Sequence, residues 1–445
     1  MSLASSLIAL GDGSLPKSFE GLRSHVDLNW IEQALELSGA ATVRRRKLPA
    51  EQVVWLVIGM ALYRDRPIPE VVHRLNLVLP DKDGERRDIS KGAIFEARSR
   101  LGAEALEDLF RLTAQHWAAE SADRLRWRGL MVLGADAATL RVPDSGENRR
   151  TFHLPGHSDA RRSAGYPQVR ITSLMVLRSH LLLDFDVADY RTSEIKLTRP
   201  IVDRVPDQSL TVLDRNFVNY AILNGIQAKG ENRHWLVRWK SFCKARTVKK
   251  LGRGDEIVEI QFTHASRRRN PDLPKSFIAR VIRYRRKGFK PGMLLTSLLD
   301  EALYPAKEVV ELYHERWELE LGYDEIKTHT LERMEAIRSE TPQGVLQEVW
   351  GIAVAYNLIR REMEAMAGAL GLPPRRISFR GSLMLIRDLF IWAATASPGS
   401  LPKMIENMRL DMRHVILPER RSERRYPRHV KVTFTGYPRN HGHPA

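Results

Sequence analysis

Leu130-Met-Val-Leu-Gly-Ala-Asp136 is a short apolar run that ends in a carboxylate, and the segments after it indicate what kind of sheet it enters. Residues 166–177 and 180–187 have the composition of two strands joined by a tight turn. Residues 192–205 predict a helix, and residues 209–214 form a second apolar strand that also ends in Asp. Strand, hairpin, helix and strand in this order predict a mixed α/β sheet.

The sequence on both sides of this region has other patterns. Residues 1–125 predict a helical N-terminal domain, in which apolar side chains recur at helical spacing after caps such as Asp27. Residues 233–299 predict a β-rich insertion of strands separated by basic loops. Helices resume after it, and residues 346–445 predict a helical C-terminal region that ends in a basic tail, residues 420–431.

Net charge is the main compositional signal. The 445 residues hold 71 Lys plus Arg against 54 Asp plus Glu, a net charge of +17. Such an excess favours a polyanionic partner such as nucleic acid over a basic surface without a partner. A single cysteine, Cys243, excludes a disulfide scaffold and zinc fingers with paired thiolates. The longest apolar run, residues 53–63, is shorter than the roughly 20 residues that span a bilayer, so we expect a cytoplasmic protein without a membrane segment.

The two strand-end carboxylates, Asp136 and Asp214, are candidates for a shared site. Ligands in open sheets gather at the ends of strands, which favours this role. The alternative for each is a turn or cap residue, the more frequent role of an Asp after a strand. Further acids compete with them: Asp144, Asp184, Asp186 and Asp189.

A third acid lies in a helix that begins near residue 306. With about 100° of rotation per residue, four side chains of this helix fall within about 60° of one another: Tyr313, Arg316, Glu320 and Lys327. Trp317 and Leu321 border this stripe and predict that it is partly buried. The alternative is a surface helix with weakly stabilising charge pairs. Asp324 is the nearest rival of Glu320.

These residues resemble the motifs of a known family. The helix is similar to the Y-R-E-K signature of DDE transposases of the insertion-sequence-4 type, with Tyr313-x2-Arg316-x3-Glu320-x6-Lys327. Asp136 in Gly-Ala-Asp-Ala-Ala-Thr resembles the first Asp segment of that family, and Asp214 in Val-Leu-Asp-Arg-Asn-Phe resembles the second, D-R-G-F. Ala137 and Asn216 stand where the family has glycines, a change that affects the local turns and removes no ligand.

The resemblance implies an α/β fold, with a ribonuclease-H-like mixed sheet and a β-rich insertion, preceded by the all-helical N-terminal domain and followed by the helical C-terminal region. The catalytic core would consist of residues 126–232 and 300–345. Three carboxylates would hold two Mg²⁺ or Mn²⁺ ions: Asp136, Asp214 and Glu320. Residues beside them would hold the DNA backbone: Tyr313, Arg316, Lys327 and Arg215.

A basic run in the N-terminal domain consists of Arg44, Arg45, Arg46 and Lys47. It is a solvated loop or, in a basic helical module, a phosphate contact. The resemblance makes it a candidate for recognising the terminal inverted repeats of double-stranded DNA.

The function that the resemblance implies is DNA transposition and recombination. A bacterial, nucleoid-associated transposase, a homodimer in the paired-end complex, would cut and join insertion-sequence ends. Two alternatives stay open: a catalytically silent DNA-binding protein derived from a transposase, and a structure-dependent nuclease on the same fold.

Overall fold

The computed structural model describes residues 26–41, 47–79, 88–155, 165–215, 219–239, 245–271, 273–285, 291–331 and 337–419. Some predicted features lie outside the described residues: Arg44, Arg45 and Arg46 of the basic run, Asn216, Cys243 and the basic tail.

The N-terminal part is helical, as the sequence predicts. Its described helices are α2 (Leu28–Leu37), α3 (Ala50–Leu62), α4 (Ile68–Arg74), α5 (Lys91–Leu101) and α6 (Glu104–Leu125). The Asp27 carboxylate accepts a hydrogen bond from the backbone N–H of Asn29 and so caps α2, and the Ser90 hydroxyl accepts one from Ala93 and caps α5.

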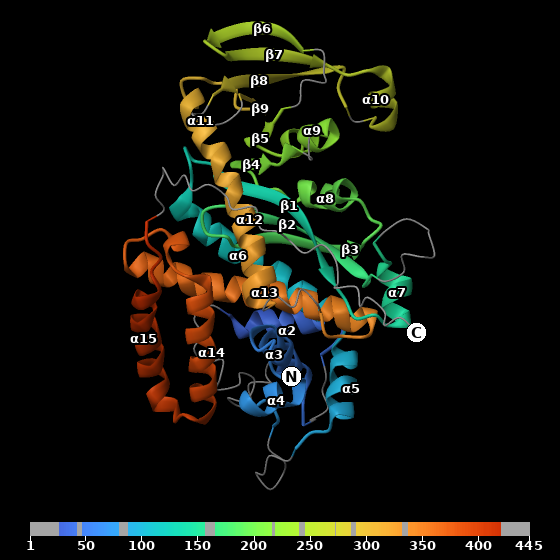
Figure 1. Ribbon diagram of the computed structural model, residues 1–445, viewed down its shortest axis with the longest axis vertical. Helices are drawn as coiled ribbons and strands as arrows, with labels where there is room; N and C mark the ends of the chain where they lie inside the picture. The colour runs from blue at the N-terminus through green and yellow to red at the C-terminus, as the bar shows by residue number, and fades with distance from the viewer. Residues whose placement is uncertain are drawn as a thin grey trace, which may run out of the picture.

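A nine-stranded sheet forms the centre of the described chain, in the order β3-β2-β1-β4-β5-β9-β8-β7-β6 (Figure 1). Its strands are β1 (Met131–Arg141), β2 (Gln168–Val176), β3 (Leu182–Asp189), β4 (Ser209–Leu213), β5 (Arg233–Arg238), β6 (Ala245–Gly252), β7 (Asp255–Gln261), β8 (Ser276–Tyr284) and β9 (Gly292–Thr296). β1, β2 and β3 pair antiparallel, whereas β4 runs parallel to β1 and β5 runs parallel to β4. The predicted mixed α/β sheet is therefore confirmed.

The segment predicted as an insertion extends this same sheet. β9 pairs antiparallel with β5, and β8, β7 and β6 follow in turn. Because β5 is a parallel neighbour of β4, the boundary predicted at residue 233 falls at the start of a core strand. The sequence pattern misses β6, since this edge strand is rich in Lys and Arg and its side chains are nearly all exposed, without apolar alternation.

Helices cover both faces of the sheet. α8 (Glu194–Asp203) and α9 (Tyr220–Ala228) pack on one face, and α6, α12 (Trp317–Asp324) and α13 (Pro342–Ala369) pack on the other. The remaining described helices are α7 (Gly146–Phe152), α10 (His264–Arg269), α11 (Ala306–Tyr313), α14 (Phe379–Thr395) and α15 (Leu401–Asp411), the last two confirming a helical C-terminal region (Figure 1). No helix among the described residues is long and apolar enough to cross a membrane.

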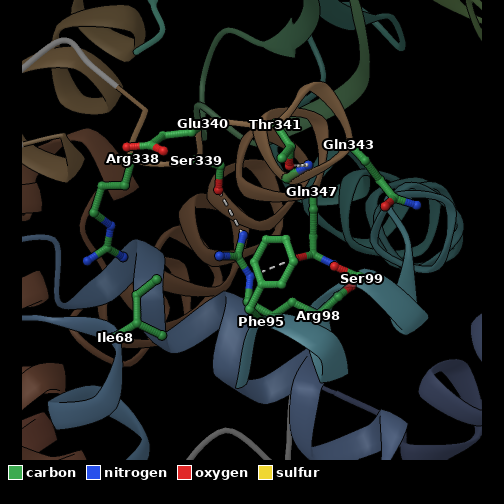
Figure 2. A pocket seen from close by; sticks show the side chains of 11 residues that line it. Ile68, Phe95, Arg98, Ser99, Arg338, Ser339, Glu340, Thr341, Gln343 and Gln347 are labelled. Atoms are coloured by element: carbon green, nitrogen blue, oxygen red, sulfur yellow. Dashed lines mark hydrogen bonds between the residues drawn. The ribbon is translucent and has the colours of Figure 1, made fainter. Parts of the chain in front are cut away.

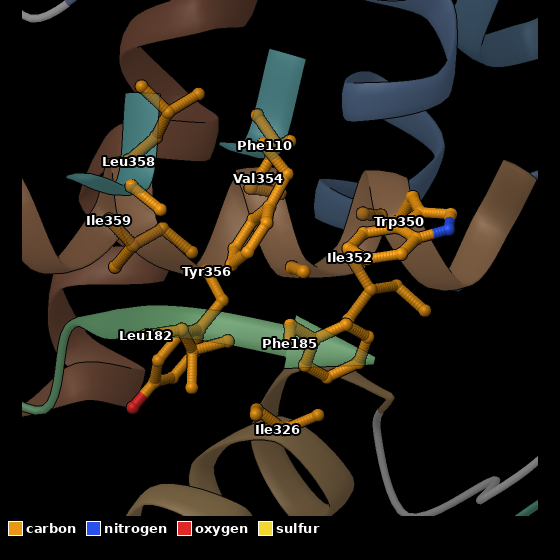
Figure 3. Packing of buried hydrophobic residues seen from close by; sticks show 14 of the residues in the cluster. Phe110, Leu182, Phe185, Ile326, Trp350, Ile352, Val354, Tyr356, Leu358 and Ile359 are labelled. Carbon is orange, nitrogen blue, oxygen red and sulfur yellow. The ribbon is translucent and has the colours of Figure 1, made fainter. Parts of the chain in front are cut away.

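α13 lies at the centre of the larger hydrophobic core. Its Trp350 ring packs against Phe110 of α6 and Phe185 of β3, with ring centroids 5.5 Å and 5.3 Å apart (Figure 3). The same core includes residues of α3, so it joins the N-terminal helices to the sheet. The division predicted between residues 345 and 346 consequently falls inside a helix.

Candidate active site

Asp136 and Asp214 lie on neighbouring parallel strands. The register of β1 and β4 pairs Ala135 with Leu213, so the next residue along each strand is one of the two aspartates. β4 and β5 continue this row, because Leu213 pairs with Val237 and the residue that follows is Arg238. Asp136, Asp214 and Arg238 therefore lie side by side where the pairing of the three parallel strands ends.

The two aspartates share the face of the sheet that α12 covers. Side chains alternate between the two faces along a strand. Val132 on β1 and Val212 on β4 belong to the core beneath α12 and α13, and each lies an even number of residues before its aspartate. Asp136 and Asp214 consequently point to the side from which the helix of Glu320 approaches.

The structure corrects the prediction that Asp136 ends its strand. β1 continues to Arg141 and stays paired with β2 over that length, whereas its pairing with β4 stops at Ala135. Asp136 is thus the first residue of β1 without a β4 partner. Beyond Ala135, β1 has a neighbouring strand, β2, on one edge only, and the apolar run stops here. From the sequence alone, the end of the apolar run is mistaken for the end of the strand.

α12 packs closely over β1 beside Asp136. A Cβ atom at Gly134 would lie 2.8 Å from Cδ1 of Leu319, so glycine is needed for this approach. One turn further on, the Tyr323 hydroxyl donates a hydrogen bond of 2.8 Å to the backbone carbonyl of Asp136. Glu320 lies between these two contacts, and they fix the helix segment that carries it.

The three predicted carboxylates are not gathered into one cluster. Among the described residues, no group of three or more His, Cys, Asp or Glu side chains is placed to hold a metal ion. The Glu320 carboxylate, 45% exposed, accepts a hydrogen bond of 3.0 Å from Arg316 instead. The structure brings Asp136 and Asp214 together and leaves Glu320 on the adjacent helix in an ion pair.

Like charges meet at this site. Burial, helped by the negative charges of Asp214 and Glu194, raises the pKa of Asp136 to about 6, against the opposing effects of the hydrogen bond from Ala137 and of Arg316. Burial alone would lower the pKa of Arg316, but its hydrogen bond to Glu320 and the nearby Asp214 raise it. The centre is therefore anionic, with Arg316 as a cation next to both acids.

The donor set fits divalent metal ions. Carboxylate oxygens are the hard ligands that Mg²⁺ and Mn²⁺ prefer. Asp214 has no hydrogen-bond or ion-pair partner among the described residues, and Asp136 accepts one hydrogen bond of 2.8 Å from the backbone N–H of Ala137. These oxygens are available to a cation, which would also relieve the repulsion that raises the pKa of Asp136.

The helix with the predicted stripe is not regular. α11 ends at Tyr313, residues His314–Arg316 form a 3₁₀ turn, and a π-helical segment, Glu325–Thr330, follows α12. A 3₁₀ turn winds more tightly than an α-helix and a π turn more loosely, so a constant rotation does not hold across the motif. Trp317 and Leu321 are 51% and 36% exposed, but within the stripe Tyr313 is buried and Arg316 and Lys327 are half-buried, so the stripe is partly buried although the two apolar residues that border it are not.

The predicted DNA-binding residues are placed in two regions. Tyr313, Arg316, Lys327 and Arg215 belong to the segments around the carboxylates, whereas Lys47 is exposed just before α3 in the N-terminal part. Burial raises the pKa of Tyr313 to about 12, so its hydroxyl stays protonated. The half-buried Lys327 makes no ion pair with a described residue.

A basic pocket that the sequence does not reveal lies next to Arg215. It has a volume of about 850 Å³ and is lined mainly by arginine and aromatic side chains: Arg215, Arg238, Trp239, Arg253, Arg283, Tyr284 and Arg285. Arg283 pairs with Glu256, whereas the other four arginines make no ion pair with a described residue. Guanidinium groups and aromatic rings together suit a nucleic-acid strand. Arg238, the last residue of β5, is the signal that could have indicated this pocket.

Buried charges anchor the opposite side of the helix. The Glu318 carboxylate lies 2.9 Å from Nε2 of His180, and Glu325 accepts a hydrogen bond of 2.9 Å from Tyr356 and pairs with Arg360. Burial would raise the pKa of Glu325, but Arg360 and His180 lower it to about 2. These partners come from the β2–β3 turn and from α13, so no local sequence pattern indicates them.

A second pocket, of about 370 Å³, lies between α5 and the start of α13 (Figure 2). In it Arg98 donates hydrogen bonds to Ser339 (3.0 Å) and to the side chain of Gln347 (2.8 Å). These groups join the N-terminal helices to α13. None of the predicted site residues lines this pocket, so we do not assign the chemistry to it.

Family models and known proteins resemble this chain over most of its length. The model of the insertion element 4 transposase N-terminal domain matches residues 16–111, and that of the transposase DDE domain matches residues 127–358. The transposase InsG for insertion sequence element IS4 of Escherichia coli (strain K12) is 36% identical over 427 residues, which cover 96% of this chain and 95% of InsG. The putative transposase InsZ of the same organism is 38% identical over 246 residues, 55% of this chain and 80% of InsZ. A cryo-EM structure of the piggyBac transposase synaptic complex with hairpin DNA matches at a TM-score of 0.43 and 11% identity, over 92% of this chain and 87% of that one.

Proposed function

The chain belongs to the DDE transposases of the insertion element 4 family, enzymes that cleave and transfer DNA strands, and we propose that its catalytic carboxylates are Asp136, Asp214 and Glu320. The observation that supports this assignment most directly is the register of β1 and β4, which sets the two aspartates on adjacent strands. The close contact at Gly134 then brings the helix of Glu320 over them.

The competing acids have other partners. Asp184 is paired with Arg111 and Arg204, which hold it at the edge of β3. Asp144 pairs with Arg149 on the exposed surface, and Asp324 accepts a hydrogen bond of 2.6 Å from Thr328 one turn along its own helix. Their engagement supports the assignment of Asp136 and Asp214, which make no hydrogen bond to another side chain and no ion pair among the described residues, whereas Glu320 is assigned from its motif and its place on α12.

The family works with divalent metal ions, and we assign Mg²⁺ or Mn²⁺ in two sites to these carboxylates. Two such ions supply Lewis-acid chemistry to the attacking and the leaving oxygen of an in-line displacement at phosphorus. Asp136 and Asp214 would hold them with oxygens that have few other partners. Glu320 would join once its bond to Arg316 is given up, and Arg316 is then free to hold a phosphate.

The DNA would lie across the carboxylates and the basic pocket. Tyr313, Lys327 and Arg215 are placed to hold its backbone beside the scissile phosphate, and the unpaired arginines of the pocket extend this surface along the sheet. The N-terminal helices with Lys47 would recognise the terminal inverted repeats, in a homodimer that pairs two ends. With DNA as its substrate, such a protein would act at the nucleoid of a bacterial cytoplasm.

This function is tested with the purified full chain and a plasmid that carries the insertion sequence between its terminal inverted repeats. With Mg²⁺ we expect cleavage at the ends and joining of the liberated ends to a target plasmid, both visible on gels and by sequencing the junctions. Cleavage without joined products would indicate a nuclease. Binding without cleavage would indicate a catalytically silent descendant.

Mg²⁺ is expected to raise the melting temperature of the wild-type chain much more than that of the Asp136→Asn variant. A ligand at a hundred times its dissociation constant stabilises the folded state by about 2.7 kcal/mol, and Asn lacks the charge that binds the cation. Thermal melting at pH 7.5, in EDTA and in MgCl₂, measures both shifts. The Asp144→Asn variant, which loses an exposed carboxylate, should keep the full shift.

Without metal, we expect the Asp136→Asn variant to have a higher melting temperature than the wild type. Because burial and Asp214 raise the pKa of Asp136 to about 6, the ionised side chain costs folding free energy at pH values above about 6. In EDTA at pH 7.5 the Asp136→Asn variant should therefore melt above the wild type, and this advantage should vanish toward pH 4. An equal Mg²⁺ shift in both proteins would show that Asp136 is not a ligand.

A further inference from the structure

A hydroxyl joins the helix of Glu320 to the backbone of Asp136. Tyr323 of α12 is 6% exposed, and its Oη donates a hydrogen bond of 2.8 Å to the Asp136 carbonyl oxygen. Burial raises the pKa of Tyr323 well above its usual range, which favours the protonated hydroxyl that this bond requires. The bond links one predicted metal ligand to the helix of another.

The neighbouring strand β2 holds this hydroxyl in one orientation. Ser173 Oγ lies 2.9 Å from Tyr323 Oη. Because the tyrosine has a single proton and gives it to Asp136, the serine hydroxyl must be the donor in that second bond. Thr172, the residue before Ser173, also donates to the Asp136 carbonyl, at 3.0 Å. The acceptor and the tyrosine are thus both fixed from β2.

Apart from the bonds of Tyr323, the contacts of this helix with β1 and β2 are apolar, whereas Glu318 on its opposite side pairs with His180 of the β2–β3 turn. Leu319 meets Gly134 of β1, and Gly322 lets Met175 of β2 approach the helix backbone. Apolar contacts have no directional preference and allow small shifts along the strand. A hydrogen bond weakens steeply outside a narrow range of distance and angle, so the Tyr323 hydroxyl is the directional contact between this helix and β1.

We infer that Tyr323 is a positioning residue for metal binding: it holds Glu320 at the place relative to Asp136 from which both can ligate the same pair of ions. Glu320 precedes Tyr323 by three residues, less than one helical turn, so a shift of the hydroxyl moves the carboxylate with it. Tyr323 itself contacts no reacting group. The inference rests on the proposed function, because it takes both acids as metal ligands.

The test compares Tyr323→Phe with Tyr63→Phe in the full chain. Tyr63 of the N-terminal part is also buried and donates a hydrogen bond of 2.5 Å to a backbone carbonyl, that of Arg387 in α14. Each variant therefore loses one hydroxyl and its bond to a backbone carbonyl, and Tyr323→Phe also loses the bond from Ser173. For both we measure melting temperature, binding to end DNA, the Mg²⁺-induced melting shift in the absence of DNA, and the Mg²⁺ dependence of cleavage.

Tyr323→Phe should bind end DNA as the wild type does, need several times more Mg²⁺ for half of its melting shift, and cleave about ten- to a hundredfold more slowly. Tyr63→Phe should match the wild type in metal binding and cleavage. Equal Mg²⁺ dependence in the two variants would overturn the inference. If Tyr323→Phe does not fold, Ser173→Ala, which removes only the hydroxyl behind Tyr323, should show the same weakening of metal binding to a smaller extent, and a wild-type Mg²⁺ dependence in that variant would overturn the inference equally.

An error in the assignment of the carboxylates and an error in the role of Tyr323 give different experimental results. If Asp136→Asn and Glu320→Gln retain metal binding and cleavage, the assignment of the carboxylates is wrong. If those variants are inactive while Tyr323→Phe behaves as Tyr63→Phe does, the carboxylates stand and only the positioning role of Tyr323 is lost.

Discussion

Asp136→Asn, Asp214→Asn and Glu320→Gln are each expected to abolish Mg²⁺-dependent cleavage at insertion-sequence ends while binding of the same DNA persists. Each change keeps the shape of the side chain and removes the charge that holds a cation. Loss of metal assistance is worth several kcal/mol, and at 1.36 kcal/mol per tenfold the rate should fall by a factor of about a thousand or more. Gel-shift binding and cleavage of labelled ends measure both properties on one preparation.

Asp324→Asn is the matched control for Glu320→Gln. It lies one turn further along the same helix, is exposed, and bonds only locally to Thr328 among the described residues. It should cleave like the wild type, because its carboxylate is engaged by Thr328. An active Asp214→Asn variant, or an Asp324→Asn variant as inactive as Glu320→Gln, would show that the ligand set is assigned wrongly.

The sequence offers candidate residues for the site, but it does not give their arrangement. Asp136 and Asp214 are recognisable because apolar strands stop at or beside them, and the parallel register then places them together. The sequence does not reveal that β1 continues past Asp136. The apolar run stops at Asp136 because the pairing of β1 with β4 stops there, whereas its pairing with β2 continues. The loss of β4 as a partner is a property of the sheet and not of the strand.

The helix with Tyr313, Arg316, Glu320 and Lys327 is a second example of an arrangement that the sequence does not give. Its spacing identifies Glu320, but a constant rotation fails where a 3₁₀ turn and a π turn interrupt the α-helix. Both irregularities depend on tertiary contacts. The π turn begins at Glu325, whose carboxylate is drawn into the core by Arg360, far along the chain. A local pattern holds no information about such a partner.

The predicted insertion shows a third reason why the sequence does not give the whole structure. Strands β7, β8 and β9 have buried alternating or apolar residues and are predicted, whereas the basic edge strand β6 is not. Sequence also cannot assign β5 to the core, because only pairing with β4 distinguishes it from the strands that follow. The basic pocket is lined by Arg215 and by residues of β5, the β6–β7 turn, β8 and β9, so it exists only once this sheet has formed.

Arg360→Met is expected to destabilise the fold by about 3–5 kcal/mol at neutral pH, because it leaves the Glu325 carboxylate buried without its cation. Arg360 is 1% exposed and pairs with Glu325 from α13, and its charge is the main cause that lowers the pKa of Glu325 to about 2. The wild-type pair therefore contributes stability above about pH 4.5, which is lost as the pH falls toward 2. The gap in melting temperature between variant and wild type should be widest at pH 7 and narrow toward pH 3, where Glu325 of the variant takes up a proton.

The double variant Arg360→Met with Glu325→Gln separates charge from packing. Removing both members of a buried pair is often nearly neutral, so the double variant should regain most of the lost stability at pH 7. Because Glu320 lies just before the π turn that begins at Glu325 and Lys327 lies within it, the single variant should also lose end cleavage at temperatures where it is still folded, and the double variant should recover it in part. A double variant no more stable than the single one would show that Arg360 acts through its packing against Tyr356 and Phe379, and that the ion pair does not set the turn.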